Sequence, residues 1–439
     1  MPRPTTPAVV LGDGLAGMAA AARLAKNGHA VTLIGNGRLG DRWAPADGPA
    51  PDLSPTVLSF PAPWRDLFRK SGRPLEEELR RSGLELVPAP PTRHLLADGS
   101  VLDLPVGRAD QLDAVRRFAG DRAATAWRDL VDGLGDVWQA LRFRGVETPL
   151  ADARTLDPPT LAALWADRAV ADLAAALPDR RLGALVAATA TEAGSDPART
   201  PALVAAGLFV ERTFGRWCLR RPEQPGRPVP LSVLVGLLTD RLALRRVVVR
   251  TGALEAVQTD RDGIAGVLLT DGTRLPTRLL VASGGLDAVT SLWARLPLRL
   301  TERSARAERR RLGRCRPAPV PASRPGPWPD ERAEDRTGGL RSASPLECRA
   351  YGPDGGALLR VLHRRPDAEA VVTDHTTAAG DGIGPVGVAW DGLDGWLDRP
   401  PTVSAVPGLR LAGPVSRSGS GPDRELLSAA LAATADAAR

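Results

Sequence analysis

Two short runs of apolar residues near the N-terminus flank an Ala-rich helical pattern. The apolar runs are Pro7 to Leu11 and Ala30 to Ile34, and the helical pattern covers Leu15 to Asn27 and ends at Gly28, a residue type favoured just beyond helix C-termini. Continuous apolar runs are typical of parallel strands buried on both faces. The pattern predicts a βαβ unit at the centre of the fold.

Farther along the chain, alternating apolar and polar residues predict antiparallel strands. A hairpin is expected where Leu95 and Leu96 meet 101–104 across Asp98-Gly99, and a three-stranded meander at 247–257, 263–270 and 274–282. Helical patterns cover 64–81, with a break at 72–74, and then dominate to about residue 208. Strands are expected within 348–373 and at 409–412, followed by a helix at about 425–438.

Composition changes sharply after residue 301. Residues 302–316 hold seven arginines against two glutamates, which leaves only +2 of the formal net charge of +7 for the rest of the chain. Charge confined to one stretch does not indicate nucleic-acid binding. A solvated helix or flexible segment is favoured, and contact with an anionic membrane surface stays open. Six prolines between Arg316 and Ser344 predict a loop or linker, because proline lacks a backbone N–H.

Length and cysteine content narrow the class of protein. A chain of 439 residues is too long for one ordinary compact core, so two domains are expected. Its three cysteines are far apart and predict neither a disulfide framework nor a metal site. This cysteine usage fits a reducing cytoplasm as the expected location. No run of about 18 apolar residues predicts a spanning helix, and peripheral membrane contact stays open.

Residues 12–17 read G-x-G-x-x-G, directly after the first predicted strand and at the start of the first predicted helix. In this position Gly12 permits a tight turn, Gly14 lets the backbone approach a pyrophosphate, and Gly17 allows the helix to pack closely on the strand. The first helical turn, with Leu15 and Ala16, offers unpaired N–H groups and a positive dipole end. The motif predicts dinucleotide binding.

The acidic residue that usually ends the second strand and binds the ribose hydroxyls is absent, because Ile34 is followed by Gly35. Asn36 offers one amide hydrogen bond in its place. Arg38 is suited to a 2′-phosphate, so an NADP-binding interpretation stays open.

Several segments resemble flavoproteins of the phytoene desaturase and amine oxidase superfamily. Gly40 and Arg42 match the E-x-x-x-x-G-G-R motif of that family, whereas Gly35 and Asp41 depart from it. Residues 52–58, which include Thr56, are similar to the family's D-x-G-P-T-V-L segment. Residues 408–413 resemble its strand into a flavin-contacting turn, although the following Pro414, Arg417 and Ser418 depart from that pattern.

The resemblance implies an α/β fold, with a Rossmann-like FAD-binding domain and an interleaved α+β substrate domain. The expected division is 1–95 (dinucleotide-binding), 96–225 (mostly helical substrate part), 226–300 (cofactor-domain return with the meander), 301–345 (Arg/Pro-rich insert or linker), 346–405 (substrate-domain strands) and 406–439 (C-terminal cofactor strand and helix). The implied cofactor is FAD. Its expected contacts are Gly12, Gly14, Leu15, Ala16, Gly17, Asn36, Gly40, Arg42, Thr56, Leu254, Gly413 and Pro414.

The function that the resemblance implies is a flavin-dependent desaturase, saturase or isomerase acting on an apolar polyene or a related secondary metabolite. The alternative is a degenerate relative that has lost productive flavin binding and serves as partner or scaffold for another enzyme, and association with a protein partner or a second copy stays open. No catalytic residue is identified, because His29, His94, His363 and His375 are scattered and stand in no nucleophile motif. His363 and His375 are the better candidates, as they flank predicted substrate-domain strands.

Overall fold

The computed structural model describes residues 6–45, 52–150, 156–297, 303–319, 321–328, 345–352, 358–365, 370–376 and 387–434. Its central element is a parallel five-stranded sheet in the order β20-β13-β1-β2-β9. The strands are β1 (Pro7–Leu11), β2 (Ala30–Gly35), β9 (Val248–Thr251), β13 (Leu279–Ser283) and β20 (Leu409–Ala412). The predicted βαβ unit is confirmed, and its helix α1 spans Leu15–Lys26.

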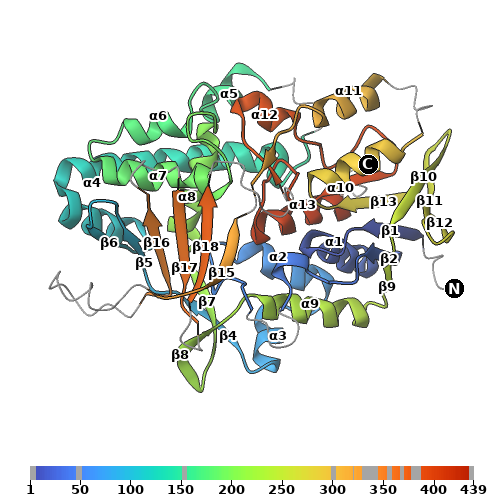
Figure 1. Ribbon diagram of the computed structural model, residues 1–439, viewed down its shortest axis with the longest axis horizontal. Coiled ribbons are helices and arrows are strands. Elements are labelled where there is room, and N and C mark those ends of the chain that lie inside the picture. Colours follow the sequence, from blue (N-terminus) through green and yellow to red (C-terminus); the bar gives the residue numbers. More distant parts are fainter. Residues whose placement is uncertain are drawn as a thin grey trace.

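This sheet is buried on both faces, as the apolar runs predict. Ala8 and Val10 of β1 pack with one helical layer, whereas Val9 belongs to a second core on the other face. The helical layer consists of α1, α2 (Ala62–Ser71), α9 (Ser232–Leu244) and α13 (Pro422–Thr434). The other face carries α10 (Leu286–Arg295) and the meander β10 (Leu254–Asp260), β11 (Gly263–Leu269) and β12 (Arg274–Pro276) (Figure 1).

The second large sheet has six strands in the order β15-β18-β17-β16-β5-β6. They are β5 (Thr92–Leu95), β6 (Val101–Leu104), β15 (Ala322–Gly326), β16 (Glu347–Tyr351), β17 (Leu358–His363) and β18 (Ala370–Thr376). Helices α4 (Arg108–Leu141), α6 (Val170–Ala175), α7 (Arg180–Glu192) and α8 (Ala206–Phe214) cover one side of it (Figure 1). Trp127 and Trp138 lie buried in this helical core.

Smaller elements connect these two parts. A third sheet contains β3 (Val57–Leu58), β4 (Glu85–Pro88), β7 (Trp217–Arg221) and β8 (Gln224–Val229), and a two-stranded one contains β14 (Pro317–Ala318) and β19 (Gly387–Val388). The remaining α-helices of the described chain are α3 (Leu75–Arg81), α5 (Pro158–Ala163), α11 (Arg303–Leu312) and α12 (Gly392–Asp398). Short turns of 3₁₀ or π-helix lie at Asp41–Trp43, Arg142–Val146 and Ala202–Ala205.

The structure confirms the hairpin and corrects two other predictions. Leu95 pairs with Val101 across the predicted turn. The first and third predicted meander strands are each divided between two sheets, because the chain leaves the parallel sheet at Gly252 and enters it again after Pro276. The Pro-rich stretch is not all loop: β15 pairs antiparallel with β18, and as an edge strand it tolerates Pro325. The Arg-rich stretch forms α11.

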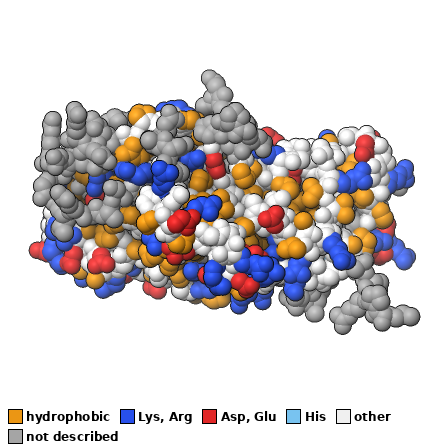
Figure 2. All heavy atoms as spheres, turned by 90° about the horizontal axis from the view of Figure 1, so that it is seen from below, with side chains coloured by type: hydrophobic (Ala, Val, Ile, Leu, Met, Phe, Trp, Pro, Cys, Tyr) orange, Lys and Arg blue, Asp and Glu red, His pale blue; other side chains and the backbone are white. Residues whose placement is uncertain are grey.

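Charges of both signs are interspersed with apolar side chains on the face shown in Figure 2. This surface has no broad region of one sign, as expected for a chain whose basic excess is concentrated in one segment. Of the helices that the structure describes, none is both long and apolar enough to cross a bilayer.

Candidate functional site

Two of the three motif glycines are required by the packing of the protein itself. Gly12 has a φ of +99°, and a Cβ atom there would lie 1.7 Å from the backbone oxygen of Ser283. A Cβ atom at Gly17 would lie 1.8 Å from the backbone oxygen of Gly12. Real Cβ atoms do not approach backbone oxygens so closely, so both positions exclude side chains. The expected packing of α1 against the sheet is therefore present.

Gly14 is different, because no atom of the described residues explains its lack of a side chain. Its φ of −65° and ψ of 175° suit any residue, and an added Cβ atom would meet only Cβ of Asp41, at 3.8 Å. Among the described residues, no side chain accepts a hydrogen bond from the N–H groups of Leu15, Ala16 or Gly17. The first turn of a helix leaves such donors unpaired and carries a partial positive charge. An open cradle beside unpaired donors fits a pyrophosphate.

The loop after β2 closes over this turn. The N–H of Gly40 donates to the backbone oxygen of Asp13 at 2.8 Å, and Gly40 forms an isolated β-bridge with Gly14. Gly40 requires glycine, because its φ is +89° and a Cβ atom would lie 2.3 Å from a methyl carbon of Val235. The Asn36 side-chain oxygen accepts the N–H of Arg38 at 2.8 Å, so part of its polar capacity serves its own turn.

Arg42 connects the same loop to the C-terminal helix. Its Nη2 donates to Oε1 of Glu425 in α13 at 2.8 Å, and its guanidinium lies 4.6 Å from the ring centre of Trp43. The Trp43 indole N–H donates to the same carboxylate oxygen at 3.3 Å. Arg42 therefore holds α13 against the turn that carries Gly40.

The carboxyl ends of β13 and β20 meet the first turn of α1 at Gly413. This glycine has a φ of +97°, and a Cβ atom there would lie 3.3 Å from the nitrogen of Gly284 and 3.8 Å from Cβ of Ala16. Its N–H donates to the hydroxyl of Ser428 in α13 at 2.8 Å. Pro414 follows as a buried residue. Segments from both ends of the chain are thus brought together at one edge of the parallel sheet.

Thr56 is fully buried, and its hydroxyl has no hydrogen-bond partner among the described residues. The segment that carries it is fixed to the start of α9, because the N–H of Ser232 donates to the Ser54 hydroxyl at 3.2 Å and that of Leu231 to the Pro55 oxygen at 2.9 Å. Ser54, which departs from the family's glycine, is therefore used structurally. A buried unpaired hydroxyl is costly, so Thr56 is a fitting contact for a ligand.

Leu254 lies at the start of β10, beside the end of β2. The N–H of Gly252 donates to the backbone oxygen of Gly35 at 3.0 Å, and Leu254 packs against the core that contains Ile34. The residues predicted to bind the cofactor thus lie mainly in the first turn of α1 and at the carboxyl ends of β1, β2 and β20, where open α/β sheets bind ligands.

We expect Asp41→Gly to raise the affinity for FAD by roughly threefold to tenfold, on the order of 1 kcal/mol. Asp41 lies next to Gly14 in a left-handed conformation with a φ of +50°, where the family has glycine, and its exposed carboxylate would repel a pyrophosphate. Flavin fluorescence titration measures the change. Asp41→Asn keeps the side-chain size and removes only the charge; if it binds no better than the wild type, repulsion is not the cause.

His363, one of the two favoured catalytic candidates, belongs to a buried polar cluster. Glu347 of β16 lies 2.9 Å from both Arg216 and Arg349 and 3.6 Å from Nδ1 of His363. Burial lowers the pKa of His363 to about 4, despite the opposing effect of Glu347. Burial likewise lowers the pKa of His375. The His363 ring is therefore neutral at pH 7, and its contact with Glu347 belongs to a structural ion-pair network.

His94 and Tyr351 form a second buried pair in the same sheet. Nδ1 of His94 lies 2.5 Å from the Tyr351 hydroxyl, and the two rings stack with centres 5.7 Å apart. Burial, aided by Arg349 and Arg216, holds the pKa of His94 well below its ordinary value. No sequence motif marks this pair, because His94 and Tyr351 lie on strands that are neighbours in the sheet but far apart along the chain. Among the residues that the structure describes, no group of three or more His, Cys, Asp or Glu side chains is placed to hold a metal ion.

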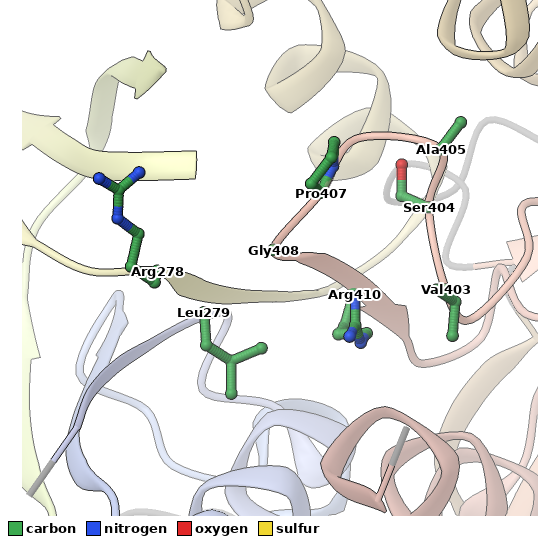
Figure 3. A pocket seen from close by; sticks show the side chains of 8 residues that line it. All are labelled: Arg278, Leu279, Val403, Ser404, Ala405, Pro407, Gly408 and Arg410. Carbon is green, nitrogen blue, oxygen red and sulfur yellow. The ribbon is translucent and has the colours of Figure 1, made fainter. Parts of the chain in front are cut away.

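A cavity of about 330 Å³ lies away from the candidate cofactor site, at the opposite ends of β13 and β20 (Figure 3). It is lined by Arg278, Leu279, Val403, Ser404, Ala405, Pro407, Gly408 and Arg410. Ser404 and Ala405 of this lining are held by Glu308 of α11: its carboxylate accepts the Ala405 N–H at 2.8 Å and the Ser404 hydroxyl at 3.1 Å. The cavity is remote from the glycine-rich turn, so it is not the cofactor site.

Glu308 should make stability depend on pH. Burial raises its pKa to about 7 from 4.5, while the two hydrogen bonds, Arg311 and Arg417 act in the opposite direction. The folded protein then binds this proton more tightly than the unfolded chain, so stability falls as pH rises from about 4.5 to about 7, by roughly 3 kcal/mol. Urea unfolding across this range measures the slope. Glu308→Gln should flatten it; an unchanged slope would exclude Glu308 as its source.

Comparison with curated proteins identifies carotenoid desaturases as sequence relatives. The chain is 32% identical over 293 residues to a hydroxyneurosporene desaturase of Cereibacter sphaeroides, which covers 63% of this chain and 55% of that protein. It is 29% identical over 306 residues to a phytoene dehydrogenase of Streptomyces griseus, which covers 67% and 57%. The matched region spans about half the length of these relatives. No family model matches the chain.

Solved structures show the same fold over nearly the whole chain. A cyclohexylamine oxidase from Brevibacterium oxydans is 17% identical with a TM-score of 0.59 and covers 99% of this chain and 100% of its own. An oxidoreductase from Methanosarcina mazei is 11% identical with a TM-score of 0.63 and covers 97% and 99%. A putrescine oxidase bound to putrescine is 14% identical with a TM-score of 0.61, and the match covers 99% of this chain and 100% of its own. At such identities the likeness concerns the fold alone, and it confirms the expected α/β architecture.

Proposed function

Since this chain is a sequence relative of the phytoene desaturases and has the fold of the FAD-dependent amine oxidases, we propose that it is a flavin-dependent oxidoreductase acting on an apolar polyene. The reaction class is desaturation, saturation or isomerisation of a polyene or a related secondary-metabolite intermediate. FAD, when bound, accepts a hydride equivalent at its ring. The protein supplies orientation and the exclusion of water.

The observation that carries this proposal is Gly14. It lacks a side chain where the packing of the described residues does not demand it, beside the unpaired N–H groups of Ala16 and Gly17. We assign the pyrophosphate to this turn. Gly413 and Pro414 then form the wall nearest the flavin, because they join the first turn of α1 to the C-terminal strand. Thr56 contributes its unpaired buried hydroxyl.

The remaining assigned residues position this site. Gly12 and Gly40 hold the two turns in left-handed conformations, Arg42 holds α13, and Asn36 and Leu254 border the adenosine end. The names of the relatives, which refer to phytoene and hydroxyneurosporene, favour an active enzyme over an inactive scaffold.

An absorption spectrum of the purified protein tests the proposal, with identification of any flavin released on denaturation. Flavin bands, and FAD in the released fraction, are the expected result. The second step is anaerobic addition of phytoene, followed by the bleaching of the flavin band and a shift of the polyene spectrum. A colourless protein that cannot be reconstituted with FAD would instead support the scaffold alternative.

We also propose that α11 gives the protein a peripheral contact with anionic membrane, where apolar polyenes reside. Arg303, Arg306, Arg309 and Arg310 are exposed, and in the described chain no carboxylate pairs with them. Polybasic surfaces are attracted to anionic lipid headgroups. Sedimentation with phosphatidylserine-containing vesicles, compared with neutral vesicles, measures the contact. Binding that is unchanged after neutralising Arg309, Arg310 and Arg311 would reject α11 as the anchor.

A further inference from the structure

The end of β2 lacks the acidic residue of dinucleotide-binding folds, yet a carboxylate occupies the place where its side chain would begin. A Cβ atom added to Gly35 would lie 2.0 Å from Cγ of Asp13 and 2.3 and 2.4 Å from its two oxygens. In a glutamate at position 35, the carboxyl carbon would lie about 2.5 Å from Cβ, two bonds away. The Asp13 carboxylate therefore falls within the reach of the missing glutamate.

The two positions exclude each other. β1 and β2 are neighbouring parallel strands in which Leu11 is level with Ile34, so the residues that follow them leave the sheet side by side. A side chain at Gly35 would overlap the Asp13 carboxylate, and glycine is the residue that permits this arrangement. The acid is thus carried by the glycine-rich turn instead of by the second strand.

The Asp13 side chain is fixed in this place and retains capacity for a ligand. Its Oδ2 accepts the N–H of Gly37 at 2.8 Å, and its backbone oxygen accepts the N–H of Gly40 at 2.8 Å. The residue is only 6% exposed, and among the described residues no arginine or lysine pairs with it. A buried carboxylate without a cation needs further donors.

We propose that Asp13 supplies the acid that binds the ribose hydroxyls of the adenosine half of the cofactor, in place of residue 35. This rests on the proposed binding of FAD. The ribose diol offers two O–H donors, and the carboxylate has acceptor positions beyond the one used by Gly37. The same negative charge disfavours a 2′-phosphate, so it opposes the NADP interpretation based on the exposed Arg38.

The test compares Asp13→Asn with the wild type in titrations of flavin-stripped protein with FAD, followed by flavin fluorescence. An asparagine oxygen can still accept the Gly37 N–H, so this variant removes the charge and keeps the turn, which circular dichroism verifies. FAD affinity should fall roughly tenfold to a hundredfold, the range for a charge-assisted hydrogen bond. The double variant Asp13→Gly with Gly35→Glu, which moves the acid to β2, should recover most of this loss.

Competition with ADP and 2′,3′-dideoxy-ADP locates the effect at the ribose. Asp13→Asn should lower the affinity for ADP and leave the affinity for the dideoxy analogue unchanged. Equal affinities of the variant and the wild type for FAD and ADP would overturn the proposal and leave Asp13 as a cap for the Gly37 turn. If the wild type binds ADP more tightly than Asp13→Asn does but never binds FAD, only the flavin function is overturned. If the wild type binds neither ADP nor FAD, both the flavin function and the role of Asp13 are overturned.

Discussion

Replacing Gly14 by valine is expected to abolish flavin binding in a protein that stays folded. The backbone of Gly14 has a φ of −65° and a ψ of 175°, which an L-residue adopts without strain, and the nearest atom to an added Cβ is 3.8 Å away. The new side chain would project into the cradle beside the unpaired N–H groups of α1. We expect a loss of at least a hundredfold in FAD affinity, with little change in the unfolding midpoint.

Gly17→Ala is the contrasting variant in the same motif. Its single methyl group would lie 1.8 Å from the backbone oxygen of Gly12, so α1 must move away from the sheet. Overpacking of this kind costs about 1–3 kcal/mol or more. Gly17→Ala should therefore lower the unfolding midpoint as well as flavin content. If Gly14→Val bound FAD like the wild type, or if it unfolded like Gly17→Ala, the assignment of the pyrophosphate to this turn would be wrong.

Removing the carboxylate of Glu347 is expected to cause the largest loss of stability among single side-chain changes in the six-stranded sheet. Burial disfavours its charged form, but Arg216 and Arg349 outweigh this and hold the pKa of Glu347 below its ordinary range. Both guanidiniums are largely buried, and Arg216 is only 1% exposed. Glu347→Leu would leave two buried cations short of a partner. Breaking a buried ion pair in this way costs about 3–5 kcal/mol.

Urea unfolding at neutral pH measures this loss, and Glu76→Leu is the matched control. Glu76 pairs with Arg65 at 2.6 Å, but both side chains are more than two-fifths exposed. Exposed pairs contribute about 0–1 kcal/mol, so the control should unfold near the wild type. Arg216 also lies 2.8 Å from Glu211, and Arg349 lies 3.4 Å from Glu192. A Glu347→Leu protein as stable as the control would show that these two pairs satisfy both arginines.

Prediction from sequence is most successful where a local pattern has a local cause. The glycine motif, α1 and both flanking strands follow from apolar runs and residue types within about 30 positions, and the hairpin at Asp98-Gly99 follows from its turn residues. The break between α2 and α3 follows from Gly72 and Pro74. The division of two predicted meander strands between sheets was missed, because alternation does not specify which neighbour a strand pairs with.

The sequence by itself thus determined the βαβ unit with its glycine-rich turn, since the tight turn and the helix start depend on neighbouring residues. Tertiary structure decided the partners of charged groups, because these come from distant segments. It placed the Asp13 carboxylate over Gly35. Two features of the sequence together could have indicated this arrangement: an aspartate within the G-x-G motif, and no acidic residue at the end of β2. It also brought Glu347 together with Arg216. A buried charge is stable only beside a partner, and here the partner comes from a segment far away in the chain.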